Sequence, residues 1–89
     1  MKRPHLTSSQ IRAARALLHW RAEDLAIASE VGVATIRRAE LVEGVTSMTT
    51  PNDMAVRRAL EAAGVEFIEE NGGGPGVRLR KSSKTKKPT

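Results

Sequence analysis

Arg37 and Arg38 are the residues whose type and position bear most directly on chemistry in this chain. An arginine side chain can bind a guanine edge through two hydrogen bonds, or it can bind a phosphate and carry no sequence information. The residues just before this pair offer less. The Thr35 hydroxyl can bond to a base edge or a phosphate, whereas Val33 and Ala34 can contact only a thymine methyl group. Two interpretations of the arginine pair stay open at this point: contact with another macromolecule, DNA or a protein, and an ordinary solvated helix face.

The chain offers little for catalysis or metal binding. It contains no cysteine, which removes thiolate chemistry and cysteine-based zinc sites. His5 and His19 have no acidic or cysteine companions at ligand spacing. Ser8 and Ser9 form no arrangement with these histidines that suggests a catalytic triad. We therefore expect no enzyme activity, no metal and no cofactor.

The charge of the chain is unevenly distributed. Its 89 residues are enough for one small domain, and the net charge is +5. Residues 1–75 contain nine basic and ten acidic residues, whereas residues 76–89 contain six basic residues and no acidic one. Compact DNA-binding domains usually have a basic body, and this body is close to neutral. No apolar stretch follows Met1, so we expect no secretory signal, no membrane span and a cytoplasmic location.

Four segments have the apolar spacing and the end signals of helices. Ser8 or Ser9 is expected to cap the first helix, and Thr50 to cap a fourth helix that stops at Gly64. The expected helices are 8–19, 21–30, 33–41 and 50–64. The residues expected to face the core include Ile11, Ala14, Leu17 and Leu18 of the first helix, Leu25, Ala26 and Ala28 of the second, and Ile36 of the third, with Trp20 as a lid and Val31 as the plug of the turn.

The period of apolar residues changes after the fourth helix. Residues 65–69 and 77–80 alternate apolar and charged side chains, which predicts two strands joined by a glycine-rich loop at 71–76. Rows of Glu66 and Glu69 facing Arg78 and Arg80 would suit an antiparallel pair. The expected organisation is a flexible N-terminus at 1–7, a helical domain at 8–64, a β-hairpin at 65–80 that packs on the domain or at a dimer interface, and a disordered basic tail at 81–89.

The run from Trp20 to Glu40, WRAEDLAIASEVGVATIRRAE, contains two short helices joined by a tight turn. It resembles the helix-turn-helix of Cro/C1-type transcriptional regulators, also called the XRE family. The match is to a bacterial subgroup of short regulators, and it extends over about residues 8–80. The resemblance implies a mainly α fold: a Cro/C1-like bundle of four helices followed by a C-terminal β-hairpin and a disordered tail. It also implies a role in transcription.

Five positions depart from the residues usual in this subgroup. The capping serine and the next glutamine of the second helix are Arg21 and Ala22, the turn glycine is Glu30, and the capping serine of the recognition helix is Gly32. Glu30 places a Cβ and a charge where a left-handed backbone is often needed. Ala39 stands where the subgroup has an aromatic residue, which predicts a gap or a shallow groove beside the third helix.

The first functional hypothesis is a protein-binding module that silences a transcriptional activator. In this respect the chain resembles small antiactivators of quorum-sensing and conjugative-transfer control carried by rhizobial mobile elements. An exposed Ile27 would form an apolar patch on the face that normally meets DNA. The residues expected to bind the activator are Ala22, Ile27, Val33, Ala34, Arg37 and Arg38.

The alternative is a sequence-specific DNA-binding repressor that acts as a homodimer on a palindromic site. In this version the third helix reads DNA, the first helix binds phosphates and the hairpin supplies a dimer surface. The residues expected to bind DNA are Thr35, Arg37, Arg38, Arg12 and Arg15. A toxin–antitoxin-type antitoxin ranks last, because such chains normally carry a longer toxin-wrapping segment. The sequence leaves open whether the protein is a monomer or a homodimer.

Overall fold

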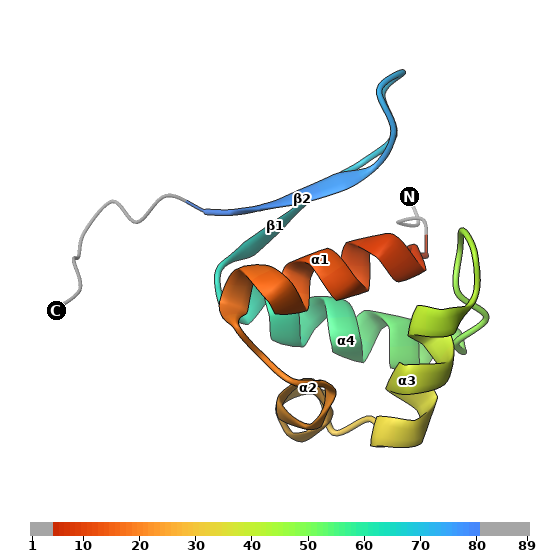
Figure 1. The fold of residues 1–89 in the computed structure, drawn as a ribbon, viewed down its shortest axis with the longest axis vertical. Helices are drawn as coiled ribbons and strands as arrows, with labels where there is room; N and C mark the ends of the chain where they lie inside the picture. The colour runs from red at the N-terminus through yellow and green to blue at the C-terminus, as the bar shows by residue number, and fades with distance from the viewer. Residues whose placement is uncertain (1–4, 81–89) are drawn as a thin grey trace, which may run out of the picture.

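The computed structural model describes residues 5–80, and Figure 1 shows how their helices and strands are arranged. The chain forms a small α-rich domain in which the expected four helices precede an antiparallel hairpin. The elements are α1 Ser8–Leu18, α2 Ala22–Ser29, α3 Val33–Leu41, α4 Thr50–Ala62, β1 Val65–Ile68 and β2 Gly76–Leu79. The basic tail expected at 81–89 lies outside the described residues, as do residues 1–4.

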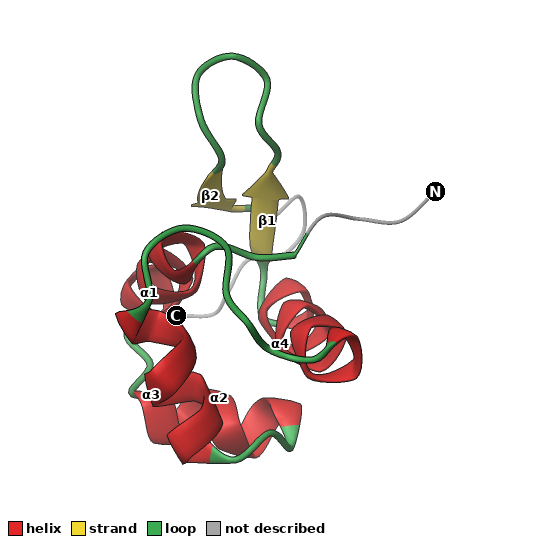
Figure 2. Cartoon of the chain, turned by 90° about the vertical axis from the view of Figure 1, so that its right-hand side faces the viewer, coloured by secondary structure: helices red, strands yellow, loops and turns green. Residues whose placement is uncertain are grey.

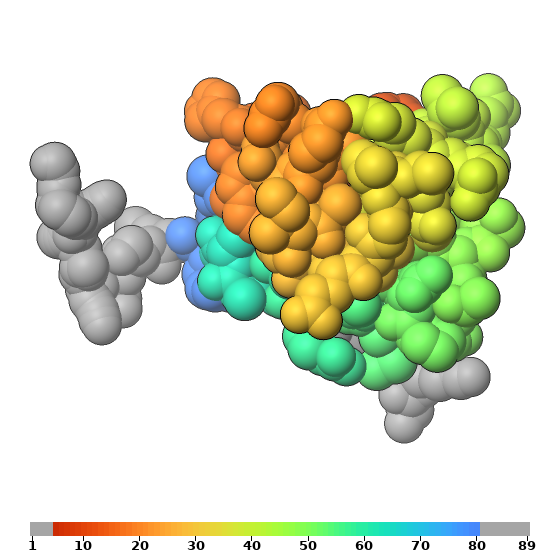
Figure 3. Space-filling model, turned by 90° about the horizontal axis from the view of Figure 1, so that it is seen from below, coloured from red at the N-terminus to blue at the C-terminus, as the bar shows by residue number. Residues whose placement is uncertain are grey.

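The helices and the hairpin form layers. In Figure 2 the hairpin lies at one end, α1 and α4 lie next to it, and α2 and α3 lie at the opposite end. The loop between the two strands projects away from the helices. This arrangement leaves one face of the α2–α3 pair without a covering element of the described chain, as Figure 3 shows with α2 in orange and α3 in yellow.

The first helix is capped one residue earlier than expected. Thr7, rather than Ser8 or Ser9, is the cap: its hydroxyl accepts from the Gln10 N–H at 3.1 Å, and the Gln10 side chain accepts from the Thr7 N–H at 3.0 Å. The cap residue needs an extended backbone, which Thr7 has with φ −92° and ψ 158°. Ser8 lies inside the helix, and its hydroxyl donates instead to the Val42 carbonyl oxygen at 2.6 Å.

The fourth helix shows the same offset. Thr49, not Thr50, accepts from the Asn52 N–H at 3.3 Å. Asp53, in the first turn, is buried and accepts from the Leu6 N–H at 3.0 Å. Leu6 is itself completely buried, so this part of the expected flexible N-terminus packs against α4 and belongs to the folded body.

The hydrophobic core lies among the four helices and the first strand. Its largest fully buried members are Leu6, Ile11, Leu25, Ile36, Val56, Leu60 and Val65. Trp20 is partly buried and packs against this cluster, as expected of a lid. Two residues expected to face inward do not: Leu17 is 36% exposed, and Ala28 is exposed. In α2 the buried stripe runs through 22, 25 and 29, and helical spacing places Ala28 outside it.

The hairpin is held by side chains of the helices. Its register pairs Glu66 with Arg78, which form an ion pair at 2.8 Å, whereas Glu69 lies beyond the end of β1. Gln10 Nε2 donates to the Gly76 carbonyl oxygen at 3.1 Å, and the Arg57 guanidinium lies 5.0 Å from the centre of the Phe67 ring. A two-stranded hairpin alone is marginally stable, so these contacts with α1 and α4 account for its place in the domain.

Candidate partner-binding surface and pocket

Arg15 is bound within the protein and is not available to a phosphate. Its Nε and Nη2 donate to the two carboxylate oxygens of Glu40, each at 2.7 Å, and its Nη1 donates to the Trp20 carbonyl oxygen at 2.9 Å. The hydrogen bond with Glu40 raises the pKa of Arg15 above its ordinary value. The DNA-binding alternative expected Arg15 to contact DNA, and the structure instead places it in a fork-to-fork pair between α1 and α3.

Other α1 side chains hold the end of α3. Arg12 donates to the Glu40 carbonyl oxygen and, at 3.3 Å, to the Ser9 hydroxyl. Ser8 donates to the Val42 carbonyl oxygen. The last carbonyl groups of a helix have no partner within the helix, so donors from α1 satisfy them and fix where α3 lies. We call the residues of this network, Ser8, Arg12, Arg15, Glu40 and Val42, the inner contact.

The turn between α2 and α3 is well bonded although Glu30, and not a glycine, lies in it. Glu30 has φ 61° and ψ 27°, the left-handed conformation that glycine adopts most easily, and its N–H donates to the Ala26 carbonyl oxygen at 2.8 Å. The Ser29 hydroxyl donates to the Leu25 carbonyl oxygen at 2.7 Å and accepts from the Val31 N–H at 3.3 Å. Val31 is buried, as expected of the plug of the turn.

The surface presented by α2 and α3 carries five of the six residues predicted to bind an activator. Ile27 is 77% exposed, Ala34, Arg37 and Arg38 are exposed, and Val33 is half-buried. We call these five residues the outer face. Ala22, the sixth predicted residue, is only 8% exposed and belongs to the core, because it lies one turn before Leu25 on the inward stripe of α2.

An ion pair crosses the outer face between its two helices. Arg37 donates to the carboxylate of Glu23 on α2. The pKa of Glu23 is lowered, first by a backbone N–H at the start of α2 and second by Arg37. Helical spacing places Ile27 one helical turn after Glu23 on α2, and Val33 one helical turn before Arg37 on α3. Both apolar residues therefore lie between the ion pair and the loop that connects the two helices. The apolar residues therefore adjoin a neutralised pair rather than a free positive charge.

The sequence reasoning missed Leu41, which is 82% exposed in the last turn of α3. It lies seven residues after Ala34 and three after Arg38, so it continues the same stripe of the helix surface. The spacing from Ala34 already indicates this position, but leucine is usually buried, so a leucine in an amphipathic helix is first interpreted as a core residue. The outer face is thus bordered by a second large exposed apolar side chain.

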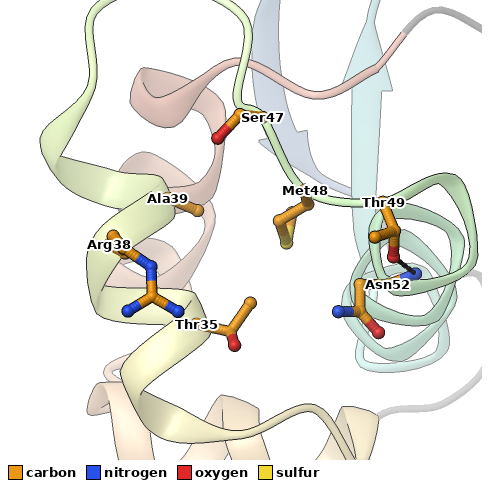
Figure 4. Close-up of a pocket in the computed structure, with 7 residues that line it drawn as sticks. All are labelled: Thr35, Arg38, Ala39, Ser47, Met48, Thr49 and Asn52. Carbon is orange, nitrogen blue, oxygen red and sulfur yellow. Dashed lines mark hydrogen bonds between the residues drawn. The ribbon is translucent and has the colours of Figure 1, made fainter.

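Arg38 differs from Arg12, Arg15 and Arg37, the other three arginines predicted to contact DNA. In the part of the chain that the structure describes it forms no hydrogen bond or ion pair, and it lies at the rim of a pocket of about 230 Å³. Figure 4 shows Arg38 and Thr35 on one side of this pocket and Asn52 on the other. The residues that line it are Thr35, Arg38, Ala39, Ser47, Met48, Thr49 and Asn52. The groove expected beside Ala39 is therefore present.

Within residues 5–80, no group of three or more histidine, aspartate or glutamate side chains is arranged to hold a metal ion. No helix in the same span has the length and apolar character needed to cross a membrane.

No family model matches the chain, and no curated protein matches it either.

Proposed function

We propose that this protein regulates transcription through a Cro/C1-like helix-turn-helix domain, acting as an antiactivator that binds a transcriptional activator with its outer face. The observation that carries the proposal is the 77% exposure of Ile27 on a surface where the neighbouring Arg37 is already paired with Glu23. A contiguous apolar patch rimmed by polar side chains is typical of a protein-binding surface, and on the outer face Ile27 is accompanied by the half-buried Val33 and the exposed Ala34. A hydrophobic anchor has little to contact on a DNA backbone.

The distribution of arginines supports a protein partner. Of the four arginines predicted for DNA, Arg12 and Arg15 donate to α3, Arg37 pairs with Glu23, and Arg38 alone is unpaired among the described residues. Residues 5–80 contain nine basic and ten acidic side chains. Affinity for duplex DNA depends on several phosphate contacts by free cations, and this body supplies few of them.

The proposal is tested with Ile27→Arg. Activators that bind the immobilised chain are purified. The affinity of each activator for the original chain and for the variant is then measured by titration. Because Ile27 is largely exposed, the substitution leaves the free energy of unfolding within about 0.5 kcal/mol of the original. We expect it to weaken the complex at least tenfold, because a hydrophobic anchor is replaced by a charge that must be desolvated. Met54→Arg is the matched control: Met54 is 48% exposed on α4, a helix that carries none of the outer-face residues, and its substitution is expected to leave the complex intact.

One observation favours a second candidate, the homodimeric DNA-binding repressor. Within residues 5–80, Arg38 is an unpaired arginine on α3, and Thr35 lies one turn before it, so these two side chains would be the readers of an operator. A mobility-shift titration at low salt separates the two functions. A palindromic operator bound at nanomolar concentration, with affinity falling steeply as salt rises and lost in Arg38→Ala, would exclude the antiactivator.

A further inference from the structure

We propose that the pocket beside Ala39 binds a carboxylate side chain, aspartate or glutamate, of the protein that docks on the outer face. The inference rests on the proposed function for the nature of the partner. It deepens that function by assigning a second contact, polar and specific, next to the apolar one at Ile27. Arg38 belongs both to the outer face and to the rim of the pocket, so one docked surface can reach the two sites.

The pocket has the size and the layering of a site for one side chain. Ala39 and Met48 are buried and form its floor, Thr35 and Asn52 are half-buried walls, and Arg38 is exposed at the rim. Its volume of about 230 Å³ is below the roughly 300–1,000 Å³ of sites that enclose drug-sized molecules. A single acidic side chain inserted from a protein surface fits that space better than a larger effector does.

The chemistry of the lining is one-sided. No acidic residue lines the pocket, and the guanidinium of Arg38 has no partner in the described chain. The hydroxyls of Thr35 and Ser47 and the side-chain amide of Asn52 also form no hydrogen bond within residues 5–80, whereas the Thr49 hydroxyl oxygen accepts from the Asn52 N–H of the helix cap. A guanidinium binds a carboxylate through two parallel hydrogen bonds, and the nearby hydroxyl and amide groups can donate to its remaining lone pairs.

A carboxylate matches this site better than the phosphates of duplex DNA do. A duplex carries closely spaced negative charges and is held by several cations at once. Here the helix carrying Arg38 has only one other arginine, Arg37, and that residue is already bound by Glu23. One free guanidinium beside a small cavity complements one negative charge, so the protein partner is the favoured source of the anion.

The test is an amide chemical-shift titration of the full chain with four probes: a capped hexapeptide with a central glutamate, the same peptide with glutamine, inorganic phosphate, and a duplex of random sequence. We expect the glutamate peptide to give saturable shifts at Thr35, Ala39 and Met48, with at least fivefold higher affinity than the glutamine peptide. Arg38→Gln is expected to abolish that preference, because only the guanidinium tells the two peptides apart.

Arg58→Gln is the matched control, because Arg58 is an exposed α4 arginine that does not line the pocket, and the preference survives its substitution. Ala39→Phe fills the pocket and is expected to remove the shifts. Arg38→Gln changes only an exposed side chain, so the test does not depend on whether Ala39→Phe folds.

Several results would overturn the inference. Equal affinity for the two peptides, an equal loss in Arg58→Gln, or preferential saturation of the same amides by phosphate or by the duplex would each do so, and the last would assign the pocket to phosphate. Failure of the proposed function has a different signature. If an activator complex forms, is broken by Ile27→Arg and is unchanged by Arg38→Gln, the pocket inference fails and the antiactivator stands. If the chain binds an operator and binds no activator, the antiactivator proposal fails, whatever the peptide titrations show.

Discussion

Two regions of this molecule, the inner contact and the outer face, each contain two arginines, with opposite consequences. In the inner contact Arg15 forms two 2.7 Å hydrogen bonds with a carboxylate whose side chain is 9% exposed. On the outer face Arg38 has no partner within residues 5–80. The residue type is the same, and the difference lies in whether a buried acceptor faces it across a helix contact. An arginine in the sequence therefore points to the binding of another molecule only where the structure shows that no acceptor within the protein already binds it.

The two regions also depend on each other. The inner contact satisfies carbonyl groups at the end of α3 and ties that helix to α1, so the α3 part of the outer face is carried on a helix whose position is fixed. Binding surfaces on rigid elements lose less entropy on association than mobile ones do. In the proposed function, the paired arginines of the inner contact contribute to binding indirectly, by holding the helix that carries Arg38.

The largest effect expected from this comparison is on stability. Arg15→Ala leaves the buried Glu40 carboxylate without its guanidinium, and we expect the free energy of unfolding to fall by about 2–3 kcal/mol, below the full cost for a completely buried pair because the Arg15 side chain is 22% exposed. The matched change Arg38→Ala is expected to cost no more than about 0.5 kcal/mol. Urea unfolding of the two variants measures the contrast. Equal losses would mean that the two regions do not differ in the way described.

Much of the fold follows from the sequence because its signals are local. The helix-ending glycine at 64, the alternation at 65–69 and the glycine-rich loop each depend on neighbouring residues, and the structure has these elements within one or two residues of the expected bounds. The caps were displaced by one residue because adjacent Thr and Ser residues satisfy the same preference. Only the three-dimensional backbone distinguishes Thr7 from Ser8.

The site was less predictable because its properties depend on distant residues. Glu40 lies 25 positions after Arg15, and nothing in the local pattern says that they meet. Gln10 reaches the hairpin 66 residues later in the chain. The sequence predicts that Ala22 lies on the surface with Ile27, but the orientation of α2 places Ala22 in the core. The groove beside Ala39 is expected from the small side chain, but the side chains opposite α3, Ser47, Thr49 and Asn52, come from the segment before α4 and from the start of α4, which no pattern in α3 reveals.

A smaller effect is expected at the turn that sets the angle of the outer face. Glu30 has a left-handed backbone, which costs a residue with a Cβ roughly 1–2 kcal/mol, partly offset by the greater freedom of glycine in the unfolded chain. We expect Glu30→Gly to raise the free energy of unfolding by about 0.5–1 kcal/mol, a shift of a few degrees in Tm. Glu30→Ala keeps the Cβ and is expected to gain nothing, which separates backbone strain from loss of charge. A gain of equal size in both variants would contradict the conformational explanation.

The smallest effect concerns pH and tests whether Arg37 is held on the outer face. The pKa of Glu23 lies below its ordinary value of 4.5, first because of a backbone N–H and second because of Arg37. A carboxyl whose pKa is lowered by folding stabilises the folded state above the unfolded pKa, and that contribution disappears as the pH falls through the folded pKa. We therefore expect the ion pair between Arg37 and Glu23 to break only at pH below 4.5, where the Glu23 carboxylate becomes protonated. Carboxyl chemical shifts of Glu23 measured across this range should give a higher pKa in Arg37→Gln than in the original chain, still below 4.5 because the backbone donor remains. Arg38→Gln should leave the Glu23 titration unchanged. A change as large as that in Arg37→Gln would show that the two arginines share the Glu23 carboxylate, and Arg38 would then not be free to bind a partner.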